Sequence, residues 1–501
     1  MSEGSRPALF RSLTRKAMLR HPLSCLTAIA LSLAVAGPAL GQYDGDADLP
    51  SLISDDTQAV SGKEVRLGRA WLRQFRAQAP QWQDPIAQHY VESLVSGLLP
   101  YSHVGGIDPV ITLVASERLN AFAVPGGVIG VNAGLFAFAE REAPLASVLA
   151  HELGHLSQRH YARGQARAEQ TQIPAMAAML AGMLIAAGGG GDAGIAAAMG
   201  SQAALFQDQL AYSRRFEREA DRIGLQAMAD AGYAPQAMVE MFRTMQRKIS
   251  LQGGNPPEFL LTHPVTESRI SDAQARADQL SVNTPRDEDI EYHLIRARAL
   301  LAIHDQDPRQ AATRLARGQA PEMARRYLAA LADAEAGRSD AALQALDALA
   351  RRLPDLAMLP ASAAEVALEA GRVDEAIARS RHQLRLMPDY VPANLLLGEA
   401  LLQRDADAAY RQLSELATRR PEDPRVFDLL AEAAGRSGRP AWGHLARAEH
   451  LQLTGHIDRA IRQLEVAKDV AEAERDDNAA GRIAQRREAF LEYREAMEEF
   501  Q

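Results

Sequence analysis

The sequence predicts a mostly α-helical protein with one small β-sheet in its first half and a helical repeat array in its second half. Helical patterning begins at Lys63 and covers almost the whole chain after Pro144. Residues 109–116 and 121–132 are rich in apolar and β-branched residues and contain a Pro-Gly-Gly turn, which is typical of paired strands. After about residue 290 a 34-residue period indicates stacked helical repeats.

The composition is that of an ordinary globular protein. Of the 501 residues, 47% are hydrophobic and 24% are charged. A single hydrophobic core rarely extends beyond about 250–300 residues, so we expect two or three domains. The formal net charge of −9 gives no support for nucleic-acid binding, which usually needs a basic face.

The first forty residues have the pattern of a secretory signal peptide. Five basic residues precede the apolar run 23–36, which is too short to span a bilayer, and the run ends near a small-x-small cleavage site at Ala39-Leu40-Gly41. We predict a signal peptide over residues 1–41, and a mature protein in a bacterial periplasm or secreted; an uncleaved membrane anchor is the alternative. The single cysteine, Cys25, lies in this segment, so a metal site in the mature protein must use histidine and carboxylate ligands.

Residues 173–200 form an apolar hairpin pattern interrupted by four consecutive glycines. The apolar run before the glycines has about fifteen residues, which is too few to span a membrane. Packed core is the first interpretation. A lid over a cleft, or an element in peripheral contact with a membrane surface, is the alternative.

The second half of the chain repeats short motifs at a fixed distance. Ala-Gly-Arg at 336–338 recurs at 370–372, which is 34 residues later. Pro-Asp at 354–355 recurs at 388–389, again 34 residues later. This period, with small residues where helices cross, resembles tetratricopeptide repeats, although an unrelated helical solenoid would differ little in consequence. Such arrays bind segments of other proteins on a concave face.

The segment "SVLAHELGHLSQRH" contains a histidine pair with metal-ligand spacing. In a helix each residue turns by about 100°, so His151 and His155 lie about 40° apart and one turn along, and both imidazoles can reach one ion. Glu152 lies to one side and can reach a water molecule at that ion without binding the metal. Two neutral ligands beside a general base are what metal-assisted hydrolysis requires. His160 is about 140° from His155 on a continuous helix, so we expect it to face elsewhere as a structural or surface histidine.

A third ligand must come from elsewhere, and geometry alone does not select it. Residues 212–232 are predicted to form a second helix that ends at a glycine, and three of its carboxylates are candidates: Glu217, Glu219 and Asp221. Glu217 and Asp221 share one face, with Ala220 and Gly224 leaving room for close helix packing. Solvated salt bridges are the alternative role for each carboxylate.

The H-E-x-x-H motif, followed some sixty residues later by S-R-x-x-E-x-x-A-D, resembles the HtpX-like and CAAX-prenyl-type zinc metallopeptidases, which have a gluzincin-type fold of helices and a small sheet. The nearest similarity is to the periplasmic BepA/YfgC-type branch, which joins this catalytic domain to C-terminal tetratricopeptide repeats. The resemblance implies one Zn²⁺ per chain, held by His151, His155 and Glu217. It implies Glu152 as the catalytic base and Asp221 as a supporting residue or proton donor.

The same resemblance assigns further residues and the domain limits. Asn120, Ala121 and Phe122 would belong to a strand that binds an extended substrate by β-augmentation. His263 would lie near the zinc site, and we hypothesise that it is a fourth ligand or that its loop gates the site. The alternative is that it only orders the turn at Pro264. The metallopeptidase domain is expected over residues 42–280 and the repeat domain over 290–501.

The function that the resemblance implies is that of a periplasmic zinc endopeptidase with a chaperone-like role in outer-membrane β-barrel assembly and quality control. Its substrates would be misfolded or immature outer-membrane proteins, and the repeats would dock on the assembly machinery. The main alternative is a non-enzymatic repeat adaptor with a structural zinc site, and a murein peptidase is a third interpretation. Glu152→Gln separates the first two, because only a peptidase should lose activity.

Overall fold

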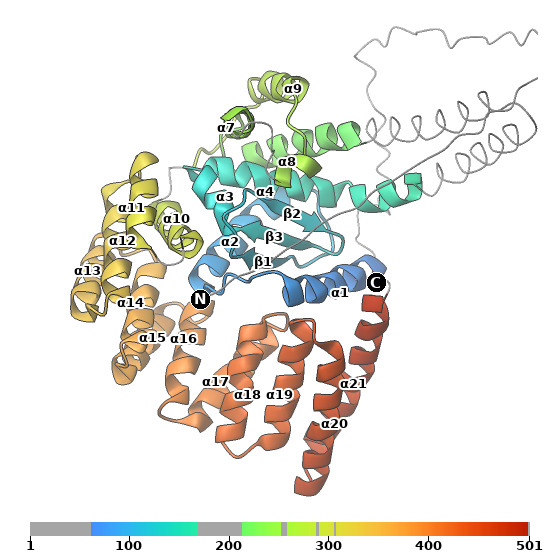
Figure 1. The fold of residues 1–501 in the computed structure, drawn as a ribbon, viewed down its shortest axis with the longest axis vertical. Helices are drawn as coiled ribbons and strands as arrows, with labels where there is room; N and C mark the ends of the chain where they lie inside the picture. Colours follow the sequence, from blue (N-terminus) through green and yellow to red (C-terminus); the bar gives the residue numbers. More distant parts are fainter. Residues whose placement is uncertain (1–61, 169–212, 252–257, 287–289, 305–306, 499–501) are drawn as a thin grey trace, which may run out of the picture. The chain divides into compact units, whose positions relative to one another are not determined.

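The computed structural model gives a mostly helical fold with one three-stranded sheet, which confirms the predicted fold class (Figure 1). The predicted signal peptide and the apolar hairpin at 173–200 lie outside the described part of the chain. No helix among the described residues is both long and apolar enough to cross a lipid bilayer. The described residues are 62–168, 213–251, 258–286, 290–304 and 307–498.

The N-terminal part is built from the sheet and the helices around it. Its helices include α1 (Gly62–Gln78), α2 (Pro85–Leu98), α3 (Ala133–Phe138), α4 (Glu142–Ser157), α7 (Gln236–Leu251), α8 (Glu258–Thr262) and α9 (Glu267–Ala277), with a 3₁₀ turn at Leu99–Tyr101. Residues 160–168 and 213–230 are also helical. The second of these ranges carries the three candidate carboxylates, as predicted.

The sheet has strand order β1-β3-β2, with β1 at Val110–Val114, β2 at Ala121–Val124 and β3 at Val128–Asn132. β1 and β3 run parallel, and β2 and β3 run antiparallel. The turn between β2 and β3 contains Gly126 and Gly127, both with φ of 78°. A Cβ at Gly126 would lie 2.5 Å from the Glu64 carbonyl oxygen of α1, so only glycine lets the turn and α1 pack so closely.

The core of this part surrounds α4. Thirteen of its sixteen residues are buried, and it contacts β2, α2 and α7. A helix buried on nearly every side holds its side chains in fixed positions, because neighbouring atoms leave few alternative rotamers. α4 is therefore a rigid support for any site built on it.

The first helix after residue 290 packs into the same core. It is α10 (Ile290–Ile303), where Tyr292 donates to the Ala139 carbonyl and the Arg296 Nε donates to the Phe136 carbonyl at 2.9 Å. At its other face, Arg298 forms an ion pair of 2.5 Å with Asp84. The repeat array thus begins on a helix that is anchored in the N-terminal part.

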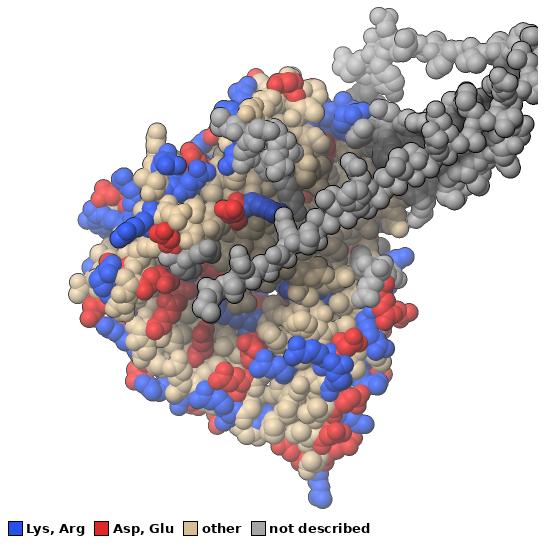
Figure 2. Space-filling view, in the orientation of Figure 1, with Lys and Arg blue, Asp and Glu red and all other residues tan. Residues whose placement is uncertain are grey.

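The rest of the chain is a succession of antiparallel helix pairs in which each helix packs on the next (Figure 1). Its helices are α11 (Pro308–Arg317), α12 (Glu322–Glu335), α13 (Ser339–Arg352), α14 (Met358–Glu369), α15 (Val373–Leu386), α16 (Val391–Leu402), α17 (Ala406–Arg419), α18 (Pro424–Arg436), α19 (Pro440–Leu453), α20 (Ile457–Glu474) and α21 (Asp477–Glu498). Figure 2 shows acidic and basic side chains interspersed over these helices on the face in view.

The 34-residue period reappears in the hydrogen bonds of the turns. The Arg338 N–H donates to the Asp333 carbonyl, and the Arg372 N–H donates to the Ala367 carbonyl, both at 2.8 Å. Each turn contains a glycine with positive φ, 74° at Gly337 and 72° at the equivalent position one repeat later. The repeated Ala-Gly-Arg motif therefore ends a helix in the same way each time.

The end of the array contacts the N-terminal part through α1. Ala70 of α1 is buried in one cluster with apolar residues of α19, α20 and α21. Arg73 donates from Nε to the Gln452 side chain at 2.5 Å and lies 4.2 Å from the centre of the Tyr493 ring. Contacts at both ends thus join the repeats to the N-terminal part.

Candidate metal centre

Two helices cross at very short range and create the site. They are α4 and the helix at 213–230, and glycines lie at the crossing on both sides. A Cβ at Gly154 would lie 2.7 Å from the Ala220 carbonyl oxygen, and a Cβ at Gly224 would lie 3.1 Å from the Ala150 carbonyl carbon. Close crossing brings Glu217 to the histidine pair of α4.

Four donor side chains converge at this crossing. The Nε2 atoms of His151 and His155 are 3.0 Å apart, and the Glu217 carboxylate lies 3.4 Å and 3.3 Å from them. His263 places its Nδ1 3.0 Å from Glu217 Oε1 and 3.3 Å from His151 Nε2. One ligand atom from each of the four residues can be chosen so that all lie within 4.8 Å of one another. Three imidazoles and a carboxylate are a donor set that fits zinc.

His263 follows α8 directly and points into the cluster. Its backbone N–H bonds the Phe259 carbonyl at 2.8 Å, and its ring lies 4.8 Å from the Phe259 ring. Its Nε2 lies 3.7 Å from Glu152 Oε1. The side chain therefore does more than order a turn: it stands between the two other histidines and the candidate base, where a fourth ligand or a gate would have to stand.

Glu152 has the environment of a general base. Its side chain is 2% exposed, and Oε1 has no hydrogen-bond partner among the described residues. Burial raises the pKa of this carboxyl above its usual value. An unpaired carboxylate oxygen beside a metal-binding cluster can take a proton from water.

The pKa values of the two α4 histidines are shifted in opposite directions. Burial lowers the pKa of His155 to about 3, which keeps the ring neutral, as a metal ligand must be. Burial also acts to lower the pKa of His151, but hydrogen bonds to Asp221 and Glu217 outweigh it and raise that pKa to about 10. Burial likewise acts to raise the pKa of Glu217, yet hydrogen bonds from the three histidines hold it well below its usual value.

Asp221 lies behind His151, on the side away from the cluster. Its Oδ1 is 2.9 Å from His151 Nδ1, and both carboxylate oxygens accept hydrogen bonds of 2.7 Å from Arg269. Burial alone would raise the pKa of Asp221, but the charge of Arg269 lowers it. An ionised carboxylate in this position favours the supporting role over that of a proton donor.

Arg269 of α9 is a residue of the site to which sequence reasoning gave no role. Besides Asp221, it contacts Glu217 Oε2 at 2.8 Å and donates to the Pro264 carbonyl at 2.8 Å. It therefore ties two carboxylates to the loop that carries His263. The available signal was its position six residues after that histidine, within one short motif.

The expectation that His160 faces away from His155 is wrong. The α4 helix ends at Ser157, and Arg159 has a left-handed φ of 49°, so the continuous-helix rotation does not apply. A new helix starts at His160, whose buried ring places Nδ1 2.8 Å from His155 Nδ1. His160 thus contacts a member of the cluster.

The predicted substrate strand lies at an edge of the sheet beside the cluster. Ala121 and Phe122 belong to β2, which among the described residues pairs with β3 alone, and Asn120 precedes it. The Phe122 ring packs against Trp71 and Phe75 of α1, with centroid distances of 5.4 and 5.2 Å. A cleft of about 240 Å³ is lined by Phe122 and Ala123 of this strand, together with Glu152, His155 and His263. Asn120 does not line this cleft, and Ala121 is buried.

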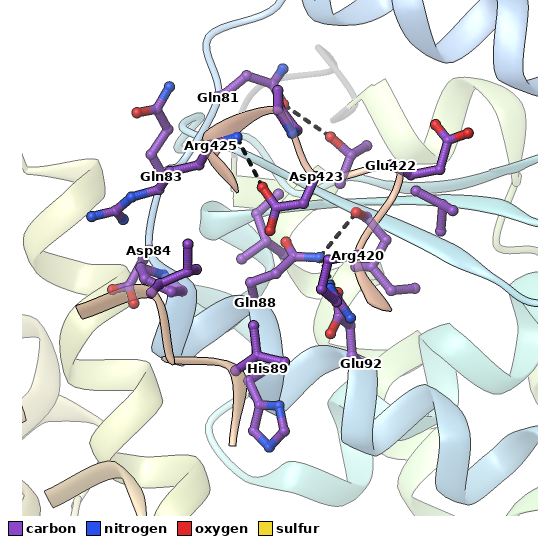
Figure 3. A pocket seen from close by; sticks show the side chains of 18 of the residues that line it. Gln81, Gln83, Asp84, Gln88, His89, Glu92, Arg420, Glu422, Asp423 and Arg425 are labelled. Carbon is purple, nitrogen blue, oxygen red and sulfur yellow. Dashed lines mark hydrogen bonds and ion pairs between the residues drawn. The ribbon is translucent and has the colours of Figure 1, made fainter. Parts of the chain in front are cut away.

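A larger cavity, of about 870 Å³, lies elsewhere, between the segment 81–92 and the repeat helices α17 to α19 (Figure 3). Among its labelled residues, Arg420 forms an ion pair with Glu92, and the Arg425 backbone N–H donates to the Asp423 carboxylate. None of the cluster residues lines this cavity. The larger cavity is therefore separate from the donor cluster.

Comparison with known proteins agrees with this geometry. Residues 85–277 match the model of peptidase family M48, and residues 367–433 match a tetratricopeptide-repeat model. The β-barrel assembly-enhancing protease of Escherichia coli K12 is 31% identical over 460 residues, which cover 90% of this chain and 93% of that protein. A putative β-barrel assembly-enhancing protease of Vibrio cholerae is 30% identical over 93% of this chain and 98% of its own length. The mitochondrial metalloendopeptidase OMA1 of Arabidopsis thaliana is 28% identical over 43% of this chain and 41% of its own.

Proposed function

The chain belongs to peptidase family M48, as a member of the group of β-barrel assembly-enhancing proteases, and from this premise we propose that it is a periplasmic zinc endopeptidase that acts on outer-membrane proteins. Membership makes the protein a metallopeptidase; the metal, the residues and the substrates are our proposals. One observation carries the assignment of the site: four donors converge beside Glu152, whose Oε1 accepts no hydrogen bond among the described residues.

We assign the metal to His151, His155 and Glu217, with one zinc ion per chain. When bound, zinc would supply Lewis acidity, which makes water at the site a stronger acid and polarises the scissile carbonyl. Glu152 takes the proton from that water, holds it in its buried pocket, and returns it to the leaving amine. Its raised pKa suits both steps, since a base with a pKa closer to neutral can also act as an acid.

Other residues of the chain orient the participants. Asp221, fixed by Arg269, holds His151 so that Nε2 faces the cluster. The strand at Asn120, Ala121 and Phe122 would hold the substrate in an extended conformation, and Phe122 is the one of these three residues that lines the cleft. His263 occupies the position between base and ligands, so we propose that its loop moves when substrate enters. His263→Ala should then raise hydrolysis of an unstructured peptide, and unchanged hydrolysis under all conditions would rule out gating.

We propose the periplasm as the location, on the basis of the predicted signal peptide at residues 1–41, and misfolded or immature outer-membrane proteins as substrates. The names of the bacterial relatives support a role in β-barrel assembly. In this proposal the repeats over 290–501 dock on the assembly machinery or on an immature barrel, while the peptidase domain over 42–280 cleaves or holds it. The segment 173–200 remains a candidate for contact with a membrane surface.

The experiment that tests the zinc assignment is metal content per chain in the purified protein, wild type beside Glu217→Ala. We expect one zinc ion per wild-type chain and most of it lost in the variant, because removal of one of three ligands leaves the ion poorly held. Glu152→Gln serves as the matched variant: it should keep the zinc and lose hydrolysis by roughly 10²–10⁴-fold. A wild-type protein without zinc under metal-replete conditions would contradict the proposal.

A second function is favoured by the position of His263. Four protein donors around one point are typical of a closed structural zinc site, as a repeat adaptor without enzymatic activity would have. The same Glu152→Gln variant separates the two proposals. An adaptor should support β-barrel assembly unchanged when Glu152 is replaced, whereas the endopeptidase should lose cleavage of its substrates.

A further inference from the structure

His155 and His160 meet through their ring nitrogens on the side of His155 that faces away from the other donors. The Nδ1–Nδ1 distance is 2.8 Å and the ring planes are 76° apart. At the same time His155 Nε2 points into the cluster, 3.0 Å from His151 Nε2. His155 thus has one nitrogen for the cluster and the other for His160, and His160 is only 5% exposed.

A carboxylate stands behind His160 in turn. His160 Nε2 lies 3.1 Å from Glu219 Oε2, and Arg163 and Arg215 hold that carboxylate at 2.8 and 2.9 Å. The His160 ring stacks on the ring of Phe216, with centroids 4.0 Å apart and an interplanar angle of 19°. The ring is therefore fixed at both nitrogens and on one face.

The protons along this line can be assigned from the chemistry of a metal ligand. A neutral histidine that binds a metal through Nε2 carries its proton on Nδ1. His155 must then donate from Nδ1, so the Nδ1 of His160 must be the unprotonated nitrogen that accepts. His160 consequently carries its proton on Nε2 and donates it to Glu219. One set of tautomers gives every ring nitrogen a complementary partner.

The two α4 ligands are thus supported in different ways. Asp221 contacts His151 Nδ1 directly, at 2.9 Å. Among the described residues, His155 Nδ1 has no direct hydrogen bond to a carboxylate; Glu219 reaches it through the imidazole of His160. Carboxylates behind histidine ligands orient the ring and raise its basicity, and their loss typically weakens metal binding about 10–100-fold.

We propose that His160 is a positioning residue of the metal site. Through the two hydrogen bonds of His160, Glu219 fixes the orientation of the ligand His155. The backbone makes this possible, because the left-handed Arg159 breaks the helix and turns His160 back towards its neighbour. The inference rests on the zinc peptidase proposed above. Without an acceptor at His160, the buried Nδ1–H of His155 has no partner, and the ring loses the orientation that zinc requires.

The test is the zinc dissociation constant of the purified full chain, measured by competition with a chromophoric chelator. His160→Phe keeps the aromatic stack on Phe216 and removes the acceptor, and it should weaken zinc binding about 10–100-fold. His160→Asn can place its side-chain oxygen near the former Nδ1 position, and it should recover most of that loss. Glu219→Gln, which keeps the shape and removes the charge, should cause a smaller loss.

Thermal unfolding of the metal-free variants supplies the control. A merely structural His160 would lower the midpoint of the metal-free protein in His160→Phe and leave the zinc affinity of the folded protein unchanged, and that result would overturn the positioning role. If His160→Phe does not fold, Glu219→Gln is the deciding variant. A zinc affinity of Glu219→Gln equal to that of wild type would overturn the proposal that Glu219 orients His155 through His160. A wild-type protein that binds no zinc would overturn the peptidase itself, and the positioning role with it.

Discussion

The metal cluster and the repeat array are stabilised by opposite kinds of contact. In the cluster, four side chains from three separate parts of the sequence meet, two of them buried and two half-buried. In the array, each helix packs on its neighbours in sequence. Both regions contain arginine–aspartate pairs. The Arg269–Asp221 pair is 2.7 Å long, with side chains 5% and 8% exposed, whereas the Arg404–Asp374 pair is 3.1 Å long, with side chains 52% and 82% exposed.

This difference determines what substitutions should do. Removing one partner of a buried pair leaves an uncompensated charge in a dry place, while an exposed pair is screened by water and contributes little. In the cluster, stability and metal binding are therefore carried by a few irreplaceable groups. In the array, stability is spread over many similar small contacts.

The largest effect is expected for Arg269→Met. Its removal takes away one of the two cations, Arg269 and protonated His151, that offset the burial of Asp221 and Glu217. The metal-free protein should therefore lose about 3–5 kcal/mol of unfolding free energy. Urea unfolding of the metal-free protein measures this loss of unfolding free energy. Arg276→Met, at an exposed position of the same α9 helix, is the matched control and should stay near wild type. Equal losses in both variants would show that the buried ion pairs of Arg269 contribute no more to the unfolding free energy than an exposed arginine does.

A smaller effect is expected for Gly154→Ala. The new Cβ would meet the Ala220 carbonyl oxygen at 2.7 Å, which forces the two helices apart and costs about 1–3 kcal/mol. Zinc binding should weaken as well, because Glu217 moves with its helix. Gly164→Ala is the control: its Cβ would lie 3.8 Å from the Phe216 ring, an ordinary contact, and alanine should stabilise that helix by about 0.5–1 kcal/mol. Zinc affinity unchanged in Gly154→Ala would contradict the close-crossing explanation.

The pH dependence of zinc binding tests the electrostatics of the cluster. Burial opposes protonation of His151, but Asp221 and Glu217 outweigh it and raise the pKa of His151 to about 10, so the metal-free protein holds a proton there at neutral pH. Zinc must displace that proton, and its apparent affinity should rise about tenfold per pH unit between pH 7 and 9. The rise should level off above pH 10.

The same proton stabilises the metal-free fold. Because the folded pKa of His151 is above its usual value of 6.5, this stability is fully present below pH 6.5 and is lost as the pH rises through about 10. Asp221→Asn removes one of the groups that raise the pKa and should flatten both pH profiles. Asp230→Asn, at the exposed end of the same helix, should leave them unchanged. A flat zinc affinity in the wild type would show that His151 is neutral before zinc binds.

The sequence allowed the repeats to be predicted better than the cluster, for a physical reason. A helical repeat is fixed by local contacts, so the Ala-Gly-Arg motifs at 336–338 and 370–372 carry its period in the chain itself. The histidine pair was also local, since one helical turn joins His151 to His155. Glu217 was one of three candidates until the family resemblance selected it, because the crossing of two distant helices cannot be calculated from spacing.

Two features of the site could not be obtained from the pattern. The rotation expected for His160 assumed a continuous helix, and one residue with a left-handed backbone, Arg159, was enough to make it wrong. Arg269 was given no role because its partners, Asp221 and Glu217, are about fifty residues away in the sequence. In both cases tertiary geometry decided which groups meet.

The smallest effect is expected for Gly371→Ala in the array. Gly371 has a φ of 72°, and no atom lies within 4 Å of a Cβ placed there, so only backbone strain of roughly 1 kcal/mol opposes the change. Gly481→Ala, in the helical interior of α21 with equally open space, should be stabilising by about 0.5–1 kcal/mol. Thermal unfolding measures both.

Zinc affinity should be the same in Gly371→Ala as in wild type, because strain in one repeat turn is relieved among neighbouring helices. That expectation separates the two glycines of interest: Gly154 is required by packing at the metal site, and Gly371 by the backbone alone. A loss of zinc affinity in Gly371→Ala would mean that the array and the cluster are energetically coupled. Such coupling would pass through α1, α2 or α10, since these helices contact both regions.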